Sequence, residues 1–337
     1  MIIGNLNIRG GGSLLKRKRI SKIIKEGNTE IFLIQEYKLN NMDQNLVKSL
    51  WNREKVGWSY SSSTGNSGGI TTLWKEESVE EIFSFKGEGF LEVKLCSKGI
   101  CFYVVNIYSP CALEQKRKLR ESIIQLRLKY SDADWVLDGD FNAVCIAKER
   151  RGRSLVNRKA EMEGFSQFVE TCELQDVPCK GKCFSWFIGD GHAASRIDRF
   201  LLSEDLISSW GVVGQRIGNR YISEHYPVWL MVDKEDWGPK PFMFNNTWFE
   251  DKNFLPFIES EWNKLKVVGR SDFVLKEKLR LLKYSLRKWN VNVFGKVDLE
   301  IKEGVEEINE LDEFVSWCNL NQHAEAIQRR SVVTSRM

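Results

Sequence analysis

The 337-residue sequence contains no run of about 18 apolar residues, so it predicts no transmembrane helix. Its N-terminus enters Ile2 and Ile3 without the basic start and long apolar run of a signal peptide, so we expect none. There are only three histidines, and no second Cys or His pair completes a zinc site beside Cys179 and Cys183. These absences predict a nuclear or cytoplasmic protein that is not secreted, and we interpret its eight cysteines as reduced thiols.

The composition is that of a globular protein with one large domain and a smaller region, at 42% hydrophobic and 28% charged residues. The net charge of +4 does not by itself identify a nucleic-acid partner. The distribution of the charge is more informative, because a basic run covers residues 148–153 (KERRGR).

Short polar motifs are spread over the first two thirds of the chain, and four of the six directly follow an apolar stretch that is typical of a strand. Polar groups at strand ends are where α/β enzymes place their chemistry. Together the motifs supply carboxylates, amides, a phenol and an imidazole, which suit a hard divalent cation and a phosphate ester. The motifs are 6–10 (LNIRG), 34–36 (IQE), 106–110 (NIYSP), 139–142 (GDFN), 195–199 (SRIDR) and 223–227 (SEHYP).

Many short strand-like runs alternate with a few helical patterns up to about residue 233, which favours two sheets packed face to face and flanked by helices. The pattern then changes, and 237–241 (WGPKP) indicates a turn or linker. Two amphipathic segments of opposite charge follow and predict an antiparallel helical hairpin. We therefore expect an α/β domain over 1–233, a linker over 234–269, a hairpin over 270–318 and a disordered tail over 319–337.

The order and spacing of the motifs resemble the endonuclease/exonuclease/phosphatase superfamily, which includes DNase I and the apurinic/apyrimidinic endonucleases. The likeness is greatest to the endonuclease domain of plant LINE-type (non-LTR) retrotransposon proteins, and it extends to 67–70 (SGGI) and 160–165 (AEMEGF). The resemblance implies a four-layer α/β sandwich of two mixed sheets, in a copy truncated before the reverse transcriptase domain. One departure from the family pattern is Glu224, where Asp is usual before the histidine, and another is Leu6, where Trp is usual before Asn7.

The residues themselves permit this chemistry but do not require it. Glu36 ends an apolar run and suits Mg²⁺, although a solvated surface carboxylate fits the same pattern. Asp140 and Asn142 lie two apart, so they share one face of an extended segment, although an Asx turn has the same spacing. His225 suits a phosphate donor if an adjacent carboxylate raises its pKa.

The resemblance assigns a role to each motif residue. Glu36 and Glu224 are the metal-associated carboxylates, with Mg²⁺ or Mn²⁺ as the cofactor. The catalytic set comprises a water-activating Asp140, its partner Asn142, a phosphate-binding His225 supported by Asp198, and the phosphate contacts Asn7 and Tyr108. We expect the DNA phosphate backbone to contact the basic residues nearest the motifs, which are Arg9, Arg150, Arg151, Arg153, Arg196 and Arg199.

The sequence therefore predicts a Mg²⁺-dependent phosphodiester hydrolase, most similar to a DNA-nicking endonuclease of retrotransposon origin. Two alternatives remain open at this point. One is another substrate of the same superfamily, such as RNA, an inositol phosphate or sphingomyelin. The other is a catalytically degenerate remnant that binds DNA or a partner, which the displacement of the Glu224 carboxylate by one methylene would favour.

Overall fold

The computed structural model describes residues 1–11, 13–38, 41–51, 55–64, 67–152, 158–188, 192–232, 248–249, 251–290, 305, 308–310 and 312. The chain divides into two compact units, Met1–Lys234 together with Ile308–Met337, and Glu235–Glu307. Among the helices in these residues, none combines the length and the apolar character needed to cross a membrane.

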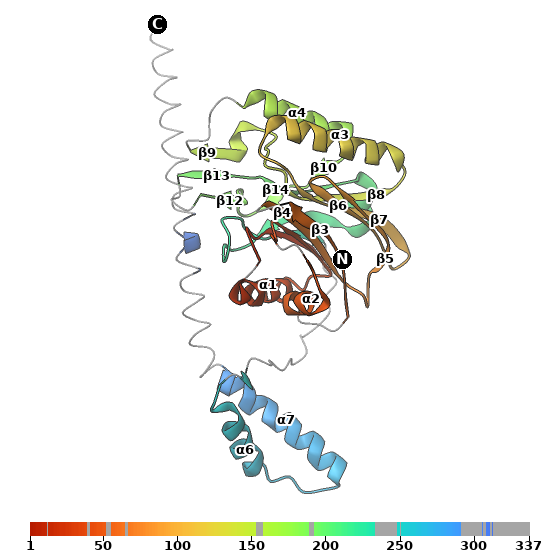
Figure 1. Cartoon of the computed structure of the whole chain (residues 1–337). Helices are drawn as coiled ribbons and strands as arrows, with labels where there is room; N and C mark the ends of the chain where they lie inside the picture. The colour runs from red at the N-terminus through yellow and green to blue at the C-terminus, as the bar shows by residue number, and fades with distance from the viewer. Residues whose placement is uncertain are drawn as a thin grey trace. The chain divides into compact units, whose positions relative to one another are not determined.

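Two mixed sheets form the body of the first unit (Figure 1). The first sheet has seven strands, in the order β11 (Cys179–Lys180), β15 (Val212–Ile217), β16 (Val228–Val232), β1 (Ile3–Asn7), β2 (Ile31–Gln35), β4 (Ser67–Lys75) and β3 (Val56–Thr64). The second has six strands, in the order β10 (Gln175–Asp176), β14 (Asp198–Leu202), β8 (Asp134–Asp140), β7 (Ile100–Tyr108), β6 (Phe90–Ser97) and β5 (Glu80–Gly87). Among the described strands, three neighbouring pairs are parallel: β1 with β2, β11 with β15, and β7 with β8. The carboxyl ends of β1 and β2 therefore lie at one edge of the first sheet, and those of β7 and β8 lie at one edge of the second.

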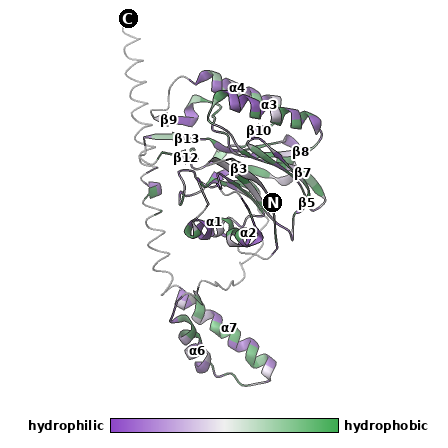
Figure 2. Ribbon diagram, in the orientation of Figure 1, coloured by the Kyte–Doolittle hydropathy of each residue, from purple (hydrophilic) through white to green (hydrophobic). Residues whose placement is uncertain are grey.

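Helices cover the outer face of each sheet and complete four layers (Figure 1). Helices α1 (Leu14–Glu26) and α2 (Gln44–Trp51) bury apolar side chains against the first sheet. Helices α3 (Leu113–Lys129) and α4 (Lys159–Thr171) do the same on the second sheet, and hydrophilic and hydrophobic residues alternate along them (Figure 2). A short helix α5 (Glu204–Trp210) follows β14. The expected four-layer α/β sandwich is therefore confirmed.

Alternation along the strands decides which side chains reach the space between the sheets. On β1, Leu6 packs under α1 and α2, while Ile3 belongs to the core between the sheets. Residues two apart share a face, so Asn5 and Asn7 also face the second sheet. The same rule applies to β8, where Val136 lies in the inner core and the next inward positions are two aspartates.

The inner core thus changes from apolar to polar toward one end of the sandwich. Four fully buried polar side chains form a layer there, and they bond across the sheets: Asn5 Nδ2 donates to Asp138 Oδ1, and Gln35 Nε2 donates to Asn106 Oδ1 at 2.7 Å. Asn106 Nδ2 also donates to the Thr71 carbonyl at 2.9 Å. We call these four residues the polar layer. The predicted site residues lie one or two positions further along the same strands.

A small third sheet joins β12 (Trp186–Phe187), β13 (Ala193–Ser195) and β9 (Arg150–Gly152), and it follows the 3₁₀ turn Ala147–Glu149. An isolated bridge links Trp186 to His225. On the second sheet, Cys96 and Cys101 are directly opposite on β6 and β7 and form a disulfide, which corrects the expectation that all the cysteines are reduced.

The C-terminal helices differ from the predicted arrangement. Helix α6 (Phe254–Lys264) lies within the range predicted as linker, and it pairs with α7 (Ser271–Trp289). Their shared core contains Trp248, Phe254, Leu282, Leu286 and Trp289. Apolar residues between 248 and 262 pack against α7. The sequence pattern predicts a linker there, because these residues follow the turn signal at 237–241.

The second half of the predicted hairpin and the predicted tail, 319–337, lie largely outside the described residues. The described residues 308–310 and 312 are helical and belong to the first unit. There Asn309 Oδ1 accepts a hydrogen bond from Lys182 Nζ at 2.7 Å, and the Asp312 carboxylate pairs with Arg220 at 3.0 Å. This short segment therefore contacts other residues of the first unit, and the second half of the predicted hairpin stays a prediction.

Candidate active site

The ends of β1, β2 and β8 bring three predicted site residues into direct contact. Asn7 Nδ2 donates to Glu36 Oε1 at 3.1 Å and to Asp140 Oδ2 at 3.0 Å, so one amide joins carboxylates from both sheets. All three side chains are buried. Asn7 and Asp140 occupy inward-facing positions at the carboxyl ends of β1 and β8, and Glu36 directly follows Gln35, the last residue of β2.

Backbone strain marks the same place. Arg9, Glu36 and Asn142 have φ values of 47°, 52° and 48°, in the left-handed region that non-glycine residues rarely adopt. Such conformations are held by surrounding contacts and are concentrated at functional sites. At Asn142, the backbone N–H donates to Asp140 Oδ1 at 2.8 Å and the side-chain amide donates to the Ser109 carbonyl at 2.7 Å.

The environment of Glu36 suits a cation. Burial alone would raise the pKa of Glu36, but hydrogen bonds from Asn7 and Lys38 and the Lys38 charge hold it below its usual range. Lys38 Nζ lies 3.1 Å from Glu36 Oε2, so a cationic group already occupies this side of the carboxylate. An ionised oxygen ligand beside a second carboxylate and an amide is a donor set that Mg²⁺ accepts. The residues present therefore fit a divalent metal.

A buried carboxylate–imidazole pair lies beside Asp140. His225 Nδ1 is 2.9 Å from Asp198 Oδ2, and His225 Nε2 is 3.9 Å from Asp140 Oδ2. One ligand atom from each of these three residues lies within 4.8 Å of the others. Burial and the nearby Asp198 charge raise the pKa of Asp140 to about 7. Burial alone would lower the pKa of His225, but the charge and hydrogen bond of Asp198 outweigh it and raise the pKa.

We predict that Asp198→Asn lowers the pKa of His225. The substitution removes the largest of the charges that favour the imidazolium, while the burial that disfavours it remains. The protonated fraction of His225 at neutral pH should fall. NMR titration of the histidine ring signals in metal-free protein measures this, with the His225 signal assigned by its loss in His225→Gln. Asp205→Asn, at an exposed position on α5, is the control; an unshifted His225 titration in Asp198→Asn would contradict the pairing.

Tyr108 and Glu224 occupy the rim of the site. Burial, together with the charge and hydrogen bond of Glu36, raises the pKa of Tyr108, so its hydroxyl stays protonated and can donate. Glu224 immediately precedes His225, but its carboxylate forms an ion pair with Arg9. Glu224 thus has a cationic partner that lies just beyond the end of β1, and its association with a metal stays a prediction.

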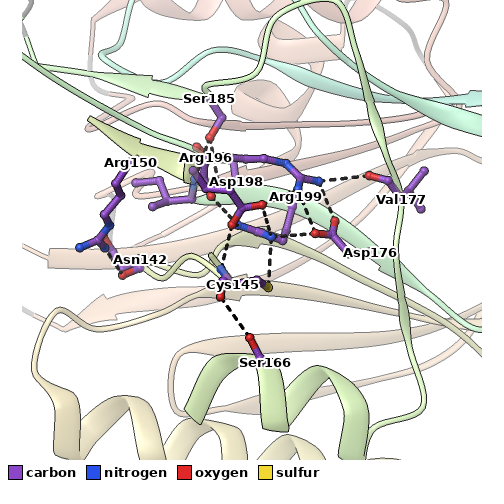
Figure 3. Close-up of polar contacts among 12 residues, drawn as sticks. Asn142, Cys145, Arg150, Ser166, Asp176, Val177, Ser185, Arg196, Asp198 and Arg199 are labelled. Carbon is purple, nitrogen blue, oxygen red and sulfur yellow. Dashed lines mark hydrogen bonds and ion pairs between the residues drawn. The ribbon is translucent and has the colours of Figure 1, made fainter. Parts of the chain in front are cut away.

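Arg196 and Arg199 form a buried charge network, which we call the arginine network (Figure 3). Arg196 pairs with Glu149 at 2.8 Å and Asp176 at 2.6 Å, and Arg199 pairs with the same two carboxylates at 2.9 and 2.8 Å. The Arg199 side chain is 0% exposed and that of Arg196 is 11% exposed. This burial contradicts the prediction that both contact DNA. The network instead anchors the segment that carries Asp198.

We predict that Glu149→Gln lowers the free energy of unfolding by about 3 kcal/mol, because removing one partner leaves a buried guanidinium incompletely compensated. Urea titration followed by circular dichroism measures the change. Glu170→Gln, at an exposed position on α4, is the matched control and should change stability by less than about 0.5 kcal/mol. Equal stability of the two variants would show that the network contributes little.

The other predicted DNA contacts differ in placement. Arg9 is partly exposed at the rim, Arg150 is half-buried with Nη2 3.4 Å from the Asn142 carbonyl, and Arg151 lies over the Phe184 ring at 4.7 Å. Arg153 lies outside the described residues. Arg9 and Arg150 thus lie beside the site.

Some site residues carried no recognisable sequence signal. Ser185 Oγ accepts hydrogen bonds from the backbone N–H groups of Ile197 and Asp198, at 3.1 and 2.9 Å, and so fixes the carboxylate that supports His225. Lys116, almost fully buried on α3, donates to the Asn142 carbonyl at 2.6 Å and pairs with Glu161. A serine in an apolar run and a lysine in a charged helix have many other readings, so neither could be found from the sequence alone.

The fold and site define the class of protein. Carboxylates, an amide and a supported imidazole at one end of a two-sheet sandwich are the arrangement of a metal-dependent phosphoesterase. Residues 4–225 match the Endonuclease/Exonuclease/phosphatase family, and the chain belongs to this family. The family predicted from the motifs is therefore confirmed. No curated protein matches the sequence.

Solved structures show the same fold at low sequence identity. The AP endonuclease LMAP from Leishmania major has a TM-score of 0.54 and 15% identity, covering 68% of this chain and 86% of that one. The 3′ phosphatase NExo from Neisseria, bound to a product DNA hairpin, has a TM-score of 0.54 and 17% identity, covering 69% and 100%. The endonuclease domain of TRAS1, a telomere-specific non-LTR retrotransposon, has a TM-score of 0.52 and 15% identity, covering 70% and 99%. These similarities establish the DNase I-like fold.

Proposed function

We propose that the first unit is a Mg²⁺-dependent endonuclease that nicks DNA and derives from a LINE-type retrotransposon. The observation that carries the proposal is the joint contact of Asn7 with Glu36 and Asp140, beside the Asp198–His225 pair. This arrangement supports the roles of Glu36 as a metal-binding carboxylate, Asp140 as a base and His225 as a cationic donor. Hydrolysis of a phosphodiester needs each of them.

The residues divide the chemistry between them. Mg²⁺ bound at Glu36 would polarise a phosphoryl oxygen and offset the charge that develops on it. Asp140, held by Asn7 and by the Asn142 backbone, orients the attacking water and accepts its proton. His225, whose protonated form Asp198 favours, donates to a phosphoryl oxygen, and Tyr108 donates a second hydrogen bond from its hydroxyl. Asn142 acts by fixing Asp140, since its own amide is engaged by Ser109.

Two further observations support DNA as the substrate. Basic side chains, among them Arg9 and Arg150, lie beside the site and can contact backbone phosphates without reading sequence. The similar 3′ phosphatase structure holds a DNA hairpin, and the similar TRAS1 domain belongs to a retrotransposon. We infer the same class of substrate and the same origin for this chain.

Plasmid nicking tests the proposal. Purified protein should convert supercoiled plasmid to open circles with Mg²⁺ or Mn²⁺, and chelation should stop the reaction. The nicks should carry 3′-hydroxyl groups that a DNA polymerase extends. Competition with RNA, inositol phosphates and sphingomyelin identifies any other substrate. Folded protein that binds DNA and cuts nothing would identify a non-catalytic remnant. In such a remnant, Arg9 would hold the Glu224 carboxylate that is otherwise associated with the metal.

A further inference from the structure

A second group of charges lies beside the Asn142 carbonyl, and among the described residues its positive charges outnumber its carboxylates. Four cationic side chains interact electrostatically with one carboxylate, Glu161, and we call them the cationic cluster: Lys116, Arg120, Arg150 and Arg158. Lys116 pairs with Glu161 and donates to the Asn142 carbonyl at 2.6 Å. Arg158 lies 3.4 Å from Glu161, and Arg150 Nη2 lies 3.4 Å from the same carbonyl of Asn142 (Figure 3).

The cluster differs from the arginine network in its charge balance. There, two guanidinium groups face two carboxylates; here, four cations share Glu161. Lys116 and Arg120 are almost completely buried, and burial with mutual repulsion lowers the pKa of Lys116. An excess of buried positive charge is unfavourable unless an anion joins it.

Buried N–H groups without a hydrogen-bond partner also indicate that an anion binds here. Among the described residues, Arg120 Nη2 and Arg150 Nε and Nη1 are buried and have no hydrogen-bond partner. Arg120 is 8% exposed, whereas the Arg158 side chain is 47% exposed, so the cluster runs from the interior to solvent. A guanidinium with free donors is suited to bidentate contact with phosphate oxygens.

We propose that the cationic cluster is a phosphate-binding subsite, with Arg150 and Arg158 as contact residues and Lys116 and Arg120 as the buried source of positive charge. Its ligand is a backbone phosphate of the DNA strand that flanks the scissile phosphate, and this assignment rests on the proposed function. The position follows from the contacts: the cluster holds the carbonyl of Asn142, whose N–H holds Asp140 at 2.8 Å. A phosphate bound here therefore places its neighbour near the proposed water-activating carboxylate.

Salt-dependent binding tests the DNA assignment. Anisotropy of a fluorescent duplex, without divalent metal, gives the affinity between about 50 and 200 mM salt, where each phosphate contact contributes a slope of about −0.9 in a logarithmic plot. Arg150→Gln and Arg158→Gln should each bind more weakly and reduce the slope by about one contact. Arg117→Gln and Lys159→Gln remove the same charge from exposed neighbours on α3 and α4 and should retain the parent slope. Equal slopes in all four variants would overturn the subsite.

A second experiment uses inorganic phosphate as the ligand and does not depend on DNA. At equal ionic strength, phosphate in place of chloride should raise the thermal unfolding midpoint of the parent protein and not that of Arg150→Gln. A phosphate effect with unchanged DNA slopes would identify a free-anion site and overturn the DNA assignment. If the parent neither binds nor nicks DNA, the proposed function fails. The subsite is overturned separately if phosphate shifts the thermal unfolding midpoints of the parent and of Arg150→Gln equally. Unfolding in chloride confirms that each variant is folded.

Discussion

Glu36→Gln should reduce Mg²⁺-dependent nicking by about 10³-fold or more, because it removes the ionised ligand that fits the metal. The substitution keeps the shape of the side chain and its contact with Asn7. The Lys38 ion pair at 3.1 Å is lost, but Lys38 is partly exposed and can be solvated. The thermal unfolding midpoint should therefore change little while nicking disappears.

Two controls make this result specific to the metal. Glu121→Gln removes the same charge at an exposed position on α3 and should nick as the parent does. Binding of Mn²⁺, followed by electron paramagnetic resonance, should weaken in Glu36→Gln and not in the control. Parent-like nicking by Glu36→Gln would remove Glu36 from the metal site.

Asp140→Asn should lower the nicking rate by about 10²- to 10⁴-fold, which is the range expected for loss of a general base. At neutral pH the same substitution should increase the stability of the folded protein, although it lowers activity. The Asp140 carboxyl has an ordinary pKa of 3.8 and a pKa of about 7 in the folded protein, through burial and the Asp198 charge. Between these values the folded protein holds a proton that the unfolded chain has released, so its stability falls as the pH rises.

The direction of this pH dependence can be measured directly. Urea unfolding of the parent and of Asp140→Asn at several pH values between about 4 and 7 should show the variant gaining stability relative to the parent as the pH rises. Above about pH 7 the difference should level off, because Asp140 is then ionised in both states. A pH-independent difference would mean that burial does not raise this pKa, and an active Asp140→Asn would exclude the residue as the base.

The sequence predicted those site residues whose position follows from a strand end. Asn7, Tyr108 and Asp140 each end an apolar run or directly follow one, so their convergence required only the two-sheet architecture. Asp198 and His225 were paired through the family resemblance, and the structure places them 2.9 Å apart. Local pattern and family motif together were sufficient to predict which of these side chains lie close together, while their roles stay predictions.

The remaining features depend on contacts between distant segments. Arg196 and Arg199 have the same letters whether they face DNA or a buried carboxylate, and their partner Glu149 is about 50 residues away. Lys116 reaches Glu161 across 45 residues and two helices. Helix α6 was missed because its apolar residues find a partner only when α7 packs against them. Burial and pairing over such distances are tertiary properties that one sequence does not display.

The polar layer also determines how the two sheets are aligned. Apolar side chains between sheets tolerate sliding, because their contacts have no direction. Hydrogen bonds such as those from Asn5 to Asp138 and from Gln35 to Asn106 do not. A slip of one sheet by a single two-residue repeat would set Asn5 against Val136 or Asp140 and leave buried donors without acceptors. The layer therefore permits one alignment of the sandwich, and that alignment is the one in which Asn7 spans the two sheets between Glu36 and Asp140.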